Sequence, residues 1–233
     1  MMDKLRKYIG LTEEHPILFE NKEEGTLKII TDPERIKREE SKLKREFRET
    51  NFQESFGEIG VLVDDPYFLV LRDLVEFPNG RLGGYLRFIN KASLEGAQAV
   101  AILPVYKGKI MVLRNFRHAT RNWEFEIPRG FGEKGISPED NAKKELFEET
   151  GSVPTKLIKL GALHIDTAVR SSPVFLFYAE VNELNSSIEE KEEVISGKIF
   201  LDQIEFEDMI KQGNIKDTFT ISAYSMAKIW GLV

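Results

Sequence analysis

The spacing of hydrophobic and polar positions changes along the chain and divides the sequence into three parts. Residues 1–57 are dominated by charged side chains, and residues 58–98 alternate strand-like apolar runs with turns. Residues 99–233 begin with two longer apolar runs and continue into segments with helical spacing. Because alternation is typical of strands and a three-to-four-residue spacing is typical of helices, the pattern predicts both kinds of element.

The first part contains a strongly charged run over residues 32–49. Thr31 or Asp32 can cap a helix there, and Pro33 suits the first helical position. The apolar stripe of this helix is thin and consists of Ile36, Leu43 and Phe47. The simplest interpretation is a solvated helix that lies against the main domain, and the alternative is a dimer contact.

Short strands are predicted on both sides of the boundary between the second and third parts. The turn signal Pro78-Asn79-Gly80 separates the runs of the second part. Residues 99–117 predict two buried strands around a turn at residues 107–109. The strand-like runs of the second part cover residues 59–63, 67–71 and 85–89.

One helix is predicted with both of its ends, over residues 138–150. Ser137 can cap its start, and Pro138 suits the first helical position. Gly151 is suited to ending the helix in a left-handed conformation. Its less polar stripe recurs every fourth residue and consists of Ala142, Leu146 and Thr150.

Three acids of this helix carry the candidate chemistry. Glu145, Glu148 and Glu149 are spaced i, i+3 and i+4, so they share one face, where each like-charged pair costs a few tenths of a kcal/mol. Divalent cations that also bind phosphate would turn this cost into a binding site. The Gly-rich stretch 126–135 precedes the helix and can bring backbone close to a ligand. Taken alone, the spacing of the acids is equally typical of a solvated acidic face.

Residues 130–152 resemble the Nudix box, whose pattern is G-x5-E-x7-R-E-U-x-E-E-x-G-U, with U an aliphatic residue. The matching positions are Gly130, Glu145, Leu146, Glu148, Glu149 and Gly151. The departures are Ile136 for the first glutamate, Lys144 for the arginine and Ser152 for the last aliphatic residue. Since lysine lacks the forked geometry of arginine, one hypothesis is that a charge pair between loop and helix has been given up.

The resemblance extends over residues 58–233 and indicates the ADP-ribose pyrophosphatase branch, through residues 114–118, 123–128 and 213–220. It implies an α+β protein with a Nudix-type α/β/α sandwich and a mixed sheet. Together with the charged composition of the first part, it gives three domains: a charged, partly helical extension at 1–57, a small antiparallel sheet at 58–98 and the catalytic domain at 99–233. That small sheet commonly pairs with a second subunit in this branch, so the resemblance implies a homodimer.

The resemblance also implies site roles. Mg²⁺, or alternatively Mn²⁺, would be held by Glu145, Glu148, Glu149 and the backbone carbonyl of Arg129. The general base in this branch is a glutamate on a loop after the strand that follows the box. Glu192 fits that position best and Glu193 comes next, while Glu148 could act through the metal cluster.

Basic residues near the box could hold the phosphates of a substrate. Arg114, Arg117 and Arg129 are the candidates, because guanidinium donors match phosphate oxygens. The alternative role for Arg117 and Arg129 is a structural pair with Glu124 or Glu126. The sequence leaves both roles open.

Composition restricts the class of protein further. The chain has 233 residues, 41% hydrophobic residues, a formal net charge of −6 and no cysteine. The charge argues against passive attraction to nucleic acid or an anionic membrane, and the lack of cysteine excludes disulfides and a thiolate nucleophile. No apolar run approaches the length of about 20 residues that spans a bilayer. With no signal-peptide core at the N-terminus, the expected location is the cytoplasm.

The expected activity is hydrolysis of a diphosphate linkage in a nucleoside diphosphate derivative. The favoured substrate is ADP-ribose or a nucleotide sugar, which would give a nucleoside monophosphate and a sugar phosphate. The alternative is a non-catalytic Nudix domain that acts as a nucleotide-sugar sensor or interaction module. The departures at Ile136 and Lys144 motivate that alternative.

Overall fold

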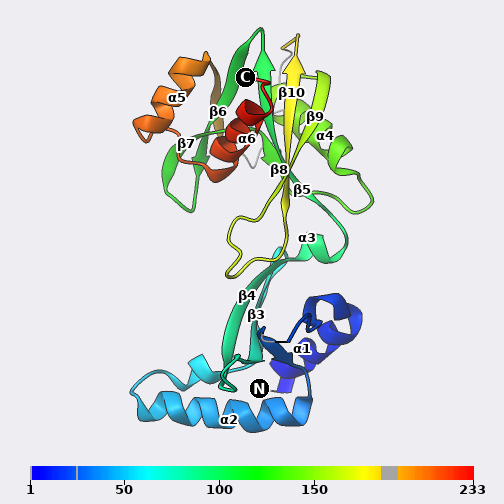
Figure 1. The fold of residues 1–233 in the computed structure, drawn as a ribbon, viewed down its shortest axis with the longest axis vertical. Coiled ribbons are helices and arrows are strands. Elements are labelled where there is room, and N and C mark those ends of the chain that lie inside the picture. Colours follow the sequence, from blue (N-terminus) through cyan, green and yellow to red (C-terminus); the bar gives the residue numbers. More distant parts are fainter. Residues whose placement is uncertain (1, 25, 185–193) are drawn as a thin grey trace. The chain divides into compact units, whose positions relative to one another are not determined.

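The computed structural model describes residues 2–24, 26–184 and 194–233, and it divides into two compact units (Figure 1). Unit 1 comprises Met1–Leu94 and Asp166–Ser172, and unit 2 comprises Glu95–Ile165 and Pro173–Val233. The candidate chemistry at residues 130–152 therefore belongs to unit 2.

Unit 1 is built around a small antiparallel sheet. Strand β3 is central: β4 pairs with one of its edges, and β1 and β2 pair with the other. The elements of unit 1 are α1 (Met2–Glu14), η1 (Pro16–Phe19), β1 (Lys28–Ile30), α2 (Pro33–Glu49), η2 (Glu54–Gly57), β2 (Gly60–Asp64), β3 (Phe68–Glu76), β4 (Leu82–Asn90) and α3 (Lys91–Leu94).

The N-terminal helices and the small sheet share one hydrophobic core. Tyr8 of α1, Ile36 of α2 and Leu71 of β3 are each fully buried in it. Asp32 caps α2 through a 2.7 Å bond from the backbone N–H of Arg35, so the predicted charged helix begins where its cap and proline indicate. Residues 1–57 are thus a structural part of unit 1 together with the sheet.

Unit 2 is built around a seven-stranded sheet with the order β11-β6-β5-β10-β9, in which β7 also pairs with β6 and β8 with β5. The β5–β10 pair is parallel and the other pairs are antiparallel, so the predicted mixed sheet is confirmed. The elements are β5 (Ala99–Tyr106), β6 (Lys109–Arg117), β7 (Asn122–Glu126), β8 (Arg129–Gly130), α4 (Pro138–Thr150), β9 (Pro154–Leu163), β10 (Val174–Val181), β11 (Ile195–Leu201), α5 (Gln203–Lys211) and α6 (Thr218–Ile229).

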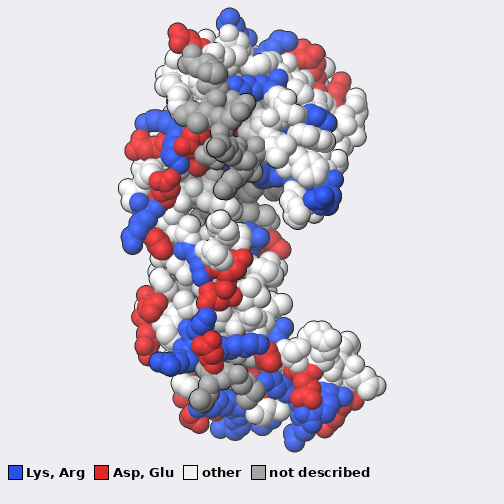
Figure 2. All heavy atoms as spheres, turned by 180° about the vertical axis from the view of Figure 1, so that it is seen from behind, with Lys and Arg blue, Asp and Glu red and all other residues white. Residues whose placement is uncertain are grey.

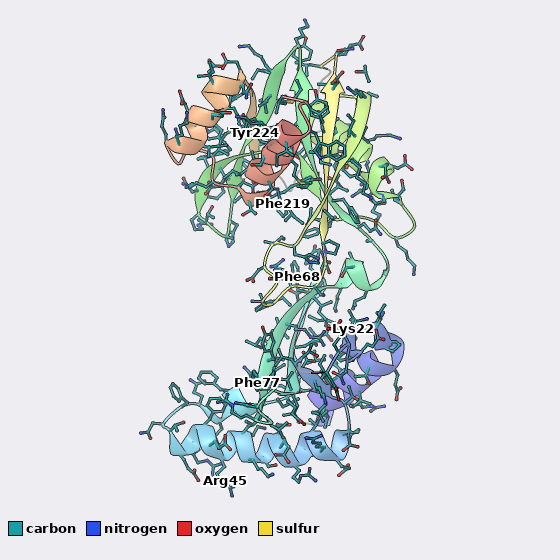
Figure 3. All side chains as sticks on the ribbon, in the orientation of Figure 1. Lys22, Arg45, Phe68, Phe77, Phe219 and Tyr224 are labelled. Carbon is teal, nitrogen blue, oxygen red and sulfur yellow. The ribbon has the colours of Figure 1, made fainter. Side chains whose placement is uncertain are left out.

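Helices cover both faces of this sheet, which gives the predicted α/β/α sandwich. On one face, Ala142 and Leu146 of α4 pack against Ile102 of β5 and its neighbours. On the other face, α5 and α6 pack through Phe206 and Tyr224, whose ring centroids lie 4.6 Å apart. Figure 3 labels Tyr224 on α6. The segment that contains β8 lies beside β5 and contacts α4, and this contact positions the candidate site.

Charged side chains of both signs are mixed on the surface. Figure 2 shows Lys and Arg interspersed with Asp and Glu over the described part of one face. The pattern agrees with the ion pairs of α2, where Arg38 and Lys42 both bind Glu39 and Arg48 binds Glu54. Among the described helices, none combines the length and the apolar character that crossing a membrane requires.

Candidate active site

Helix α4 carries the candidate acids, and its boundaries are those that the sequence predicts. The Ser137 hydroxyl accepts a 3.1 Å hydrogen bond from the backbone N–H of Asp140, which caps the first turn. Gly151 adopts a left-handed conformation (φ 69°), and its N–H donates to the Phe147 carbonyl at 2.7 Å. The predicted apolar stripe is fully buried and consists of Ala142, Leu146 and Thr150.

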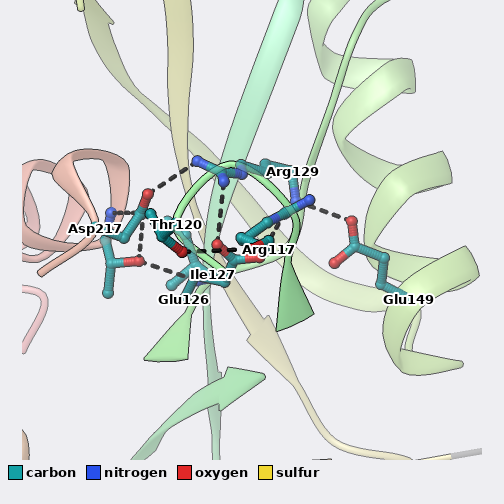
Figure 4. A network of polar contacts seen from close by, with 8 residues as sticks. Arg117, Thr120, Glu126, Ile127, Arg129, Glu149 and Asp217 are labelled. Atoms are coloured by element: carbon teal, nitrogen blue, oxygen red, sulfur yellow. Dashed lines mark hydrogen bonds and ion pairs between the residues drawn. The ribbon is translucent and has the colours of Figure 1, made fainter. Parts of the chain in front are cut away.

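Two of the three glutamates converge on strand β8. The Glu149 side chain is 7% exposed, and its Oε1 accepts a 3.2 Å hydrogen bond from the backbone N–H of Arg129 (Figure 4). The Glu145 carboxylate lies directly against the Cα of Gly130, where an added Cβ would be 2.1 Å from the carboxylate carbon. Residues one helical turn apart on α4 therefore present two carboxylates to the same dipeptide of β8.

Glu148, the third acid, contacts a lysine of its own helix. Its Oε2 lies 3.4 Å from Nζ of Lys144, one turn earlier. Lys144 Nζ also donates a 2.6 Å hydrogen bond to Glu133 of the loop, and this bond, followed by the nearby charge of Glu148, raises the pKa of Lys144 above its ordinary value. The hypothesis that a loop–helix charge pair has been given up is therefore wrong, because Lys144 of the helix is paired with Glu133 of the loop.

The carboxylates of the site fit a divalent cation that also binds a phosphate of the substrate. Within residues 2–24, 26–184 and 194–233, no group of three or more acidic or histidine side chains is arranged to hold a metal ion by itself. Mg²⁺ does not require one, because it usually retains water and binds one or two carboxylates together with substrate phosphate. Glu145 and Glu149 supply two carboxylates with hard oxygen ligands, held against one short strand. Their chemistry suits Mg²⁺ or Mn²⁺.

Comparison with known proteins assigns the family. A sequence model of the NUDIX domain matches residues 96–215, which is more than half of the chain. The chain belongs to the Nudix family. The match includes β8, the loop and α4, so the family assignment and the observed convergence of Glu145 and Glu149 concern the same part of the molecule.

One curated relative and one solved structure add detail to the Nudix assignment. The ADP-ribose pyrophosphatase of Bacillus subtilis (strain 168) is 36% identical over 138 residues, which are 59% of this chain. The match spans 66% of that relative's length, slightly less than two thirds of it. A crystal structure of an ADP compounds hydrolase superposes with a TM-score of 0.66 at 21% identity, covering 76% of this chain and 95% of the other. That structure supports the Nudix fold.

Two arginines predicted to bind substrate lie in an ion-pair network next to the Nudix box (Figure 4). Glu126 is 2% exposed, and both Arg117 and Arg129 form ion pairs with its carboxylate. The Arg129 guanidinium also donates to Asp217 at 2.9 Å. The sequence suggested Glu124 or Glu126 as a structural partner of these arginines, and in the structure both arginines pair with Glu126. The Glu124 carboxylate instead lies 3.7 Å from Nζ of Lys216.

The third candidate, Arg114, has a different environment. Its guanidinium stacks over the Trp123 ring at 4.3 Å from the centroid, and its Nη1 donates to the Ser196 hydroxyl at 3.2 Å. The arginine is partly exposed and forms no carboxylate ion pair among the described residues. Because a stacked guanidinium keeps donors available at its edge, Arg114 remains a candidate for binding phosphate.

The candidate general bases, Glu192 and Glu193, lie outside the described residues. The structure adds residues that the sequence reasoning missed. Asp217 caps α6 by accepting from the backbone N–H of Thr220 at 2.9 Å, and the sequence Asp217-Thr218-Phe219-Thr220 carries a cap signal that could have revealed it. Glu133 carries no comparable signal, because its contact with Lys144 depends on how the loop turns.

Proposed function

We propose that this protein is a Mg²⁺-dependent Nudix pyrophosphohydrolase that cleaves the diphosphate linkage of a nucleoside diphosphate derivative. The substrate is ADP-ribose or a nucleotide sugar, and the products are a nucleoside monophosphate and a sugar phosphate. The observation that carries the proposal is the convergence of Glu145 and Glu149 on the Arg129–Gly130 dipeptide. The name of the Bacillus subtilis relative, ADP-ribose pyrophosphatase, supports the substrate class.

The proposal assigns a role to each candidate residue. When bound, Mg²⁺ neutralises charge on the diphosphate and lowers the pKa of the attacking water. Glu145, Glu149 and the Arg129 carbonyl are the proposed ligands, and the Arg129 N–H fixes the orientation of the Glu149 carboxylate. Glu148 joins them as a ligand or acts on the water through the metal, and Glu192 or Glu193 is the proposed general base.

Substrate phosphate is held by guanidinium groups in this proposal. Arg114 is the candidate for direct contact, because the residue is partly exposed and its guanidinium stacks on Trp123. Arg117 and Arg129 both form ion pairs with Glu126. They bind substrate only if N–H groups that do not contact Glu126 are directed toward the phosphates.

A substrate panel tests the proposal. The full chain is incubated with ADP-ribose, nucleotide sugars and dinucleotides, with Mg²⁺ or with chelator, and the products are identified by mass spectrometry. We expect a nucleoside monophosphate to form only with the metal, and we expect Glu149→Gln to abolish turnover while the fold survives. Glu139→Gln is the matched control, because Glu139 is an exposed acid of the same helix whose nearest cation is Lys159 at 3.7 Å. Full activity of Glu149→Gln would contradict the ligand assignment.

The same panel separates catalysis from a sensor function. The contact between Lys144 and Glu148 is the observation that favours a sensor, because a cation already stands beside one of the three acids. A sensor would show a thermal shift with a nucleotide sugar and release no product with Mg²⁺ or Mn²⁺. If product forms and its formation depends on the metal, the protein is an enzyme and not a sensor.

The proposed assembly is a homodimer that pairs through unit 1. Large apolar side chains are exposed on the small sheet and beside it, among them Tyr67 at 66% and Val63 at 49%. In the proposed dimer the partner subunit covers these side chains, as partners do at contiguous apolar patches. Light scattering over a range of protein concentrations tests the assembly, and a monomer at all of them would contradict it.

A further inference from the structure

A turn in the loop before α4 brings position 136, the first Nudix-box departure, close to Glu133. Glu133 in turn contacts Lys144, the second departure. The backbone N–H of Ile136 donates to the Glu133 carbonyl at 3.3 Å, and Gly135 has a left-handed φ of 81°. This is the arrangement of a β-turn whose first and last residues are 133 and 136, with glycine at the position that requires positive φ. The ends of a β-turn lie within about 7 Å of each other. An acid at either end can therefore reach the same cation on the neighbouring helix.

We propose that Glu133 takes the place of the acid missing from position 136, and that the Glu133–Lys144 pair is a positioning device for Glu148. The proposal rests on the proposed metal-dependent function. Lys144 Nζ lies 2.6 Å from Glu133 and 3.4 Å from Glu148, so a single ammonium group is shared between the loop and the acidic face of α4. Glu133 holds the lysine on the loop side of the helix.

The exposure of these side chains indicates a positioning role instead of a large contribution to stability. The side chains of Glu133, Lys144 and Glu148 are 55%, 38% and 21% exposed, so water screens their attraction. Lysine presents one compact charge where arginine would present a rigid fork. The position of that charge therefore depends on which carboxylates stand beside it.

Removing the loop acid has a defined consequence for the metal site. Without Glu133, the ammonium of Lys144 keeps the Glu148 carboxylate as its ion-pair partner, with the charge of Glu145 also nearby. It then competes with a divalent cation for Glu148, and the local negative charge is also lower by one. Both effects weaken the affinity for the cation. Moving the acid to position 136, at the other end of the turn, restores the pair.

The test uses the full chain with Mn²⁺ as the probe, and free Mn²⁺ is counted by electron paramagnetic resonance with and without α,β-methylene-ADP. We expect Glu133→Gln to weaken Mn²⁺ binding by about fivefold. We expect the double variant Glu133→Gln/Ile136→Glu to recover the wild-type affinity. In a Lys144→Met background, Glu133→Gln should have less than half of its effect, because its partner is gone.

The matched control is Lys143→Met. Lys143 is the preceding lysine of α4, and it pairs with exposed Asp140 at 3.0 Å. The Lys143→Met variant should bind Mn²⁺ with the wild-type affinity. Unchanged affinity in Glu133→Gln, or failure of the glutamate at 136 to restore it, would overturn the positioning role while leaving the proposed function standing. A wild-type protein that binds no Mn²⁺ with the nucleotide analogue and turns over no substrate would instead refute the proposed function.

Discussion

The carboxylate of Glu145 occupies the space that a side chain at Gly130 would need. A Cβ at position 130 would lie 2.1 Å from the Glu145 carboxylate carbon and within 2.2 Å of both carboxylate oxygens. Real atoms do not approach so closely, so Gly130→Ala must displace either the glutamate or β8. We expect Mg²⁺-dependent turnover to fall about 100-fold, because a displacement of about 1 Å at a catalytic site has effects of this size.

Gly197→Ala is the control for that substitution. Gly197 lies in β11, has no positive φ and has open space around the Cβ position. It should leave turnover close to that of the wild type. Steady-state kinetics and circular dichroism of both variants check the prediction, and an active Gly130→Ala with normal metal affinity would contradict the close contact.

The local part of the site could be predicted from the sequence because its signals are local. Ser137, Pro138 and Gly151 determine the ends of α4 through contacts within a few residues, and the spacing of its apolar stripe determines which face is buried. The acids at 145 and 149 were placed correctly on one helix for the same reason. Their contact with β8 has no local signal, and the box resemblance implied only that the Arg129 carbonyl would join them as a metal ligand.

The tertiary part could not be predicted in the same way. Arg129 and Asp217 are 88 positions apart, and they meet because α6 packs against β5, the strand that pairs with β8. The position of the loop acid was missed because the box counts residues along the chain, whereas a turn makes positions 133 and 136 neighbours in space. Strand ends were also shifted: the predicted run 67–71 extends to Glu76 in β3.

Ser152, the third departure from the box, provides a stability test. Its hydroxyl oxygen is fully buried and has no hydrogen-bond partner among the described residues. A buried polar group without a partner is destabilising, so Ser152→Ala should raise the free energy of unfolding by about 1 kcal/mol. For a chain of this size, the melting temperature should then rise by roughly 2–4 °C. Ser171→Ala, in an exposed loop position, should leave it unchanged. A lower melting temperature in Ser152→Ala would show that the hydroxyl is bound in solution.

Tyr8 gives unit 1 a defined pH dependence. The side chain is fully buried, and its hydroxyl donates to Asp73 at 2.7 Å. Burial, followed by the charge of Asp73, raises the pKa of Tyr8 above its ordinary value of 10. The folded state therefore retains a proton that the unfolded state loses above about pH 10, so stability falls as pH rises through that region.

Tyr8→Phe isolates this effect. Near pH 7 the variant should be less stable by about 1–2 kcal/mol, because Asp73 loses the donor at Tyr8 and keeps its bonds from Arg87. Above about pH 10 the wild type should lose up to about 1.4 kcal/mol per pH unit more than the variant. Urea unfolding across this range measures both slopes, with exposed Tyr67→Phe as the control. Parallel slopes for the wild type and Tyr8→Phe would rule out the buried tyrosine as the cause.

Arg129→Met distinguishes a structural from a substrate-binding role for this arginine. Its guanidinium binds Glu126 at 3.0 Å and Asp217 at 2.9 Å, and Glu126 is almost completely buried. Removal of the guanidinium leaves that carboxylate with one cationic partner fewer, so the free energy of unfolding should fall by about 1–3 kcal/mol. The loss should be less than additive with that of Asp217→Asn, because the two residues share a contact.

Arg114→Met is the counterpart, since Arg114 stacks on Trp123 and forms no carboxylate pair among the described residues. It should raise the KM for the diphosphate substrate and leave the free energy of unfolding almost unchanged. Urea unfolding and steady-state kinetics on both variants give the comparison. If Arg129→Met raised KM without any loss of stability, its guanidinium would bind substrate phosphate, and the ion pairs with Glu126 and Asp217 would have to open in the substrate complex.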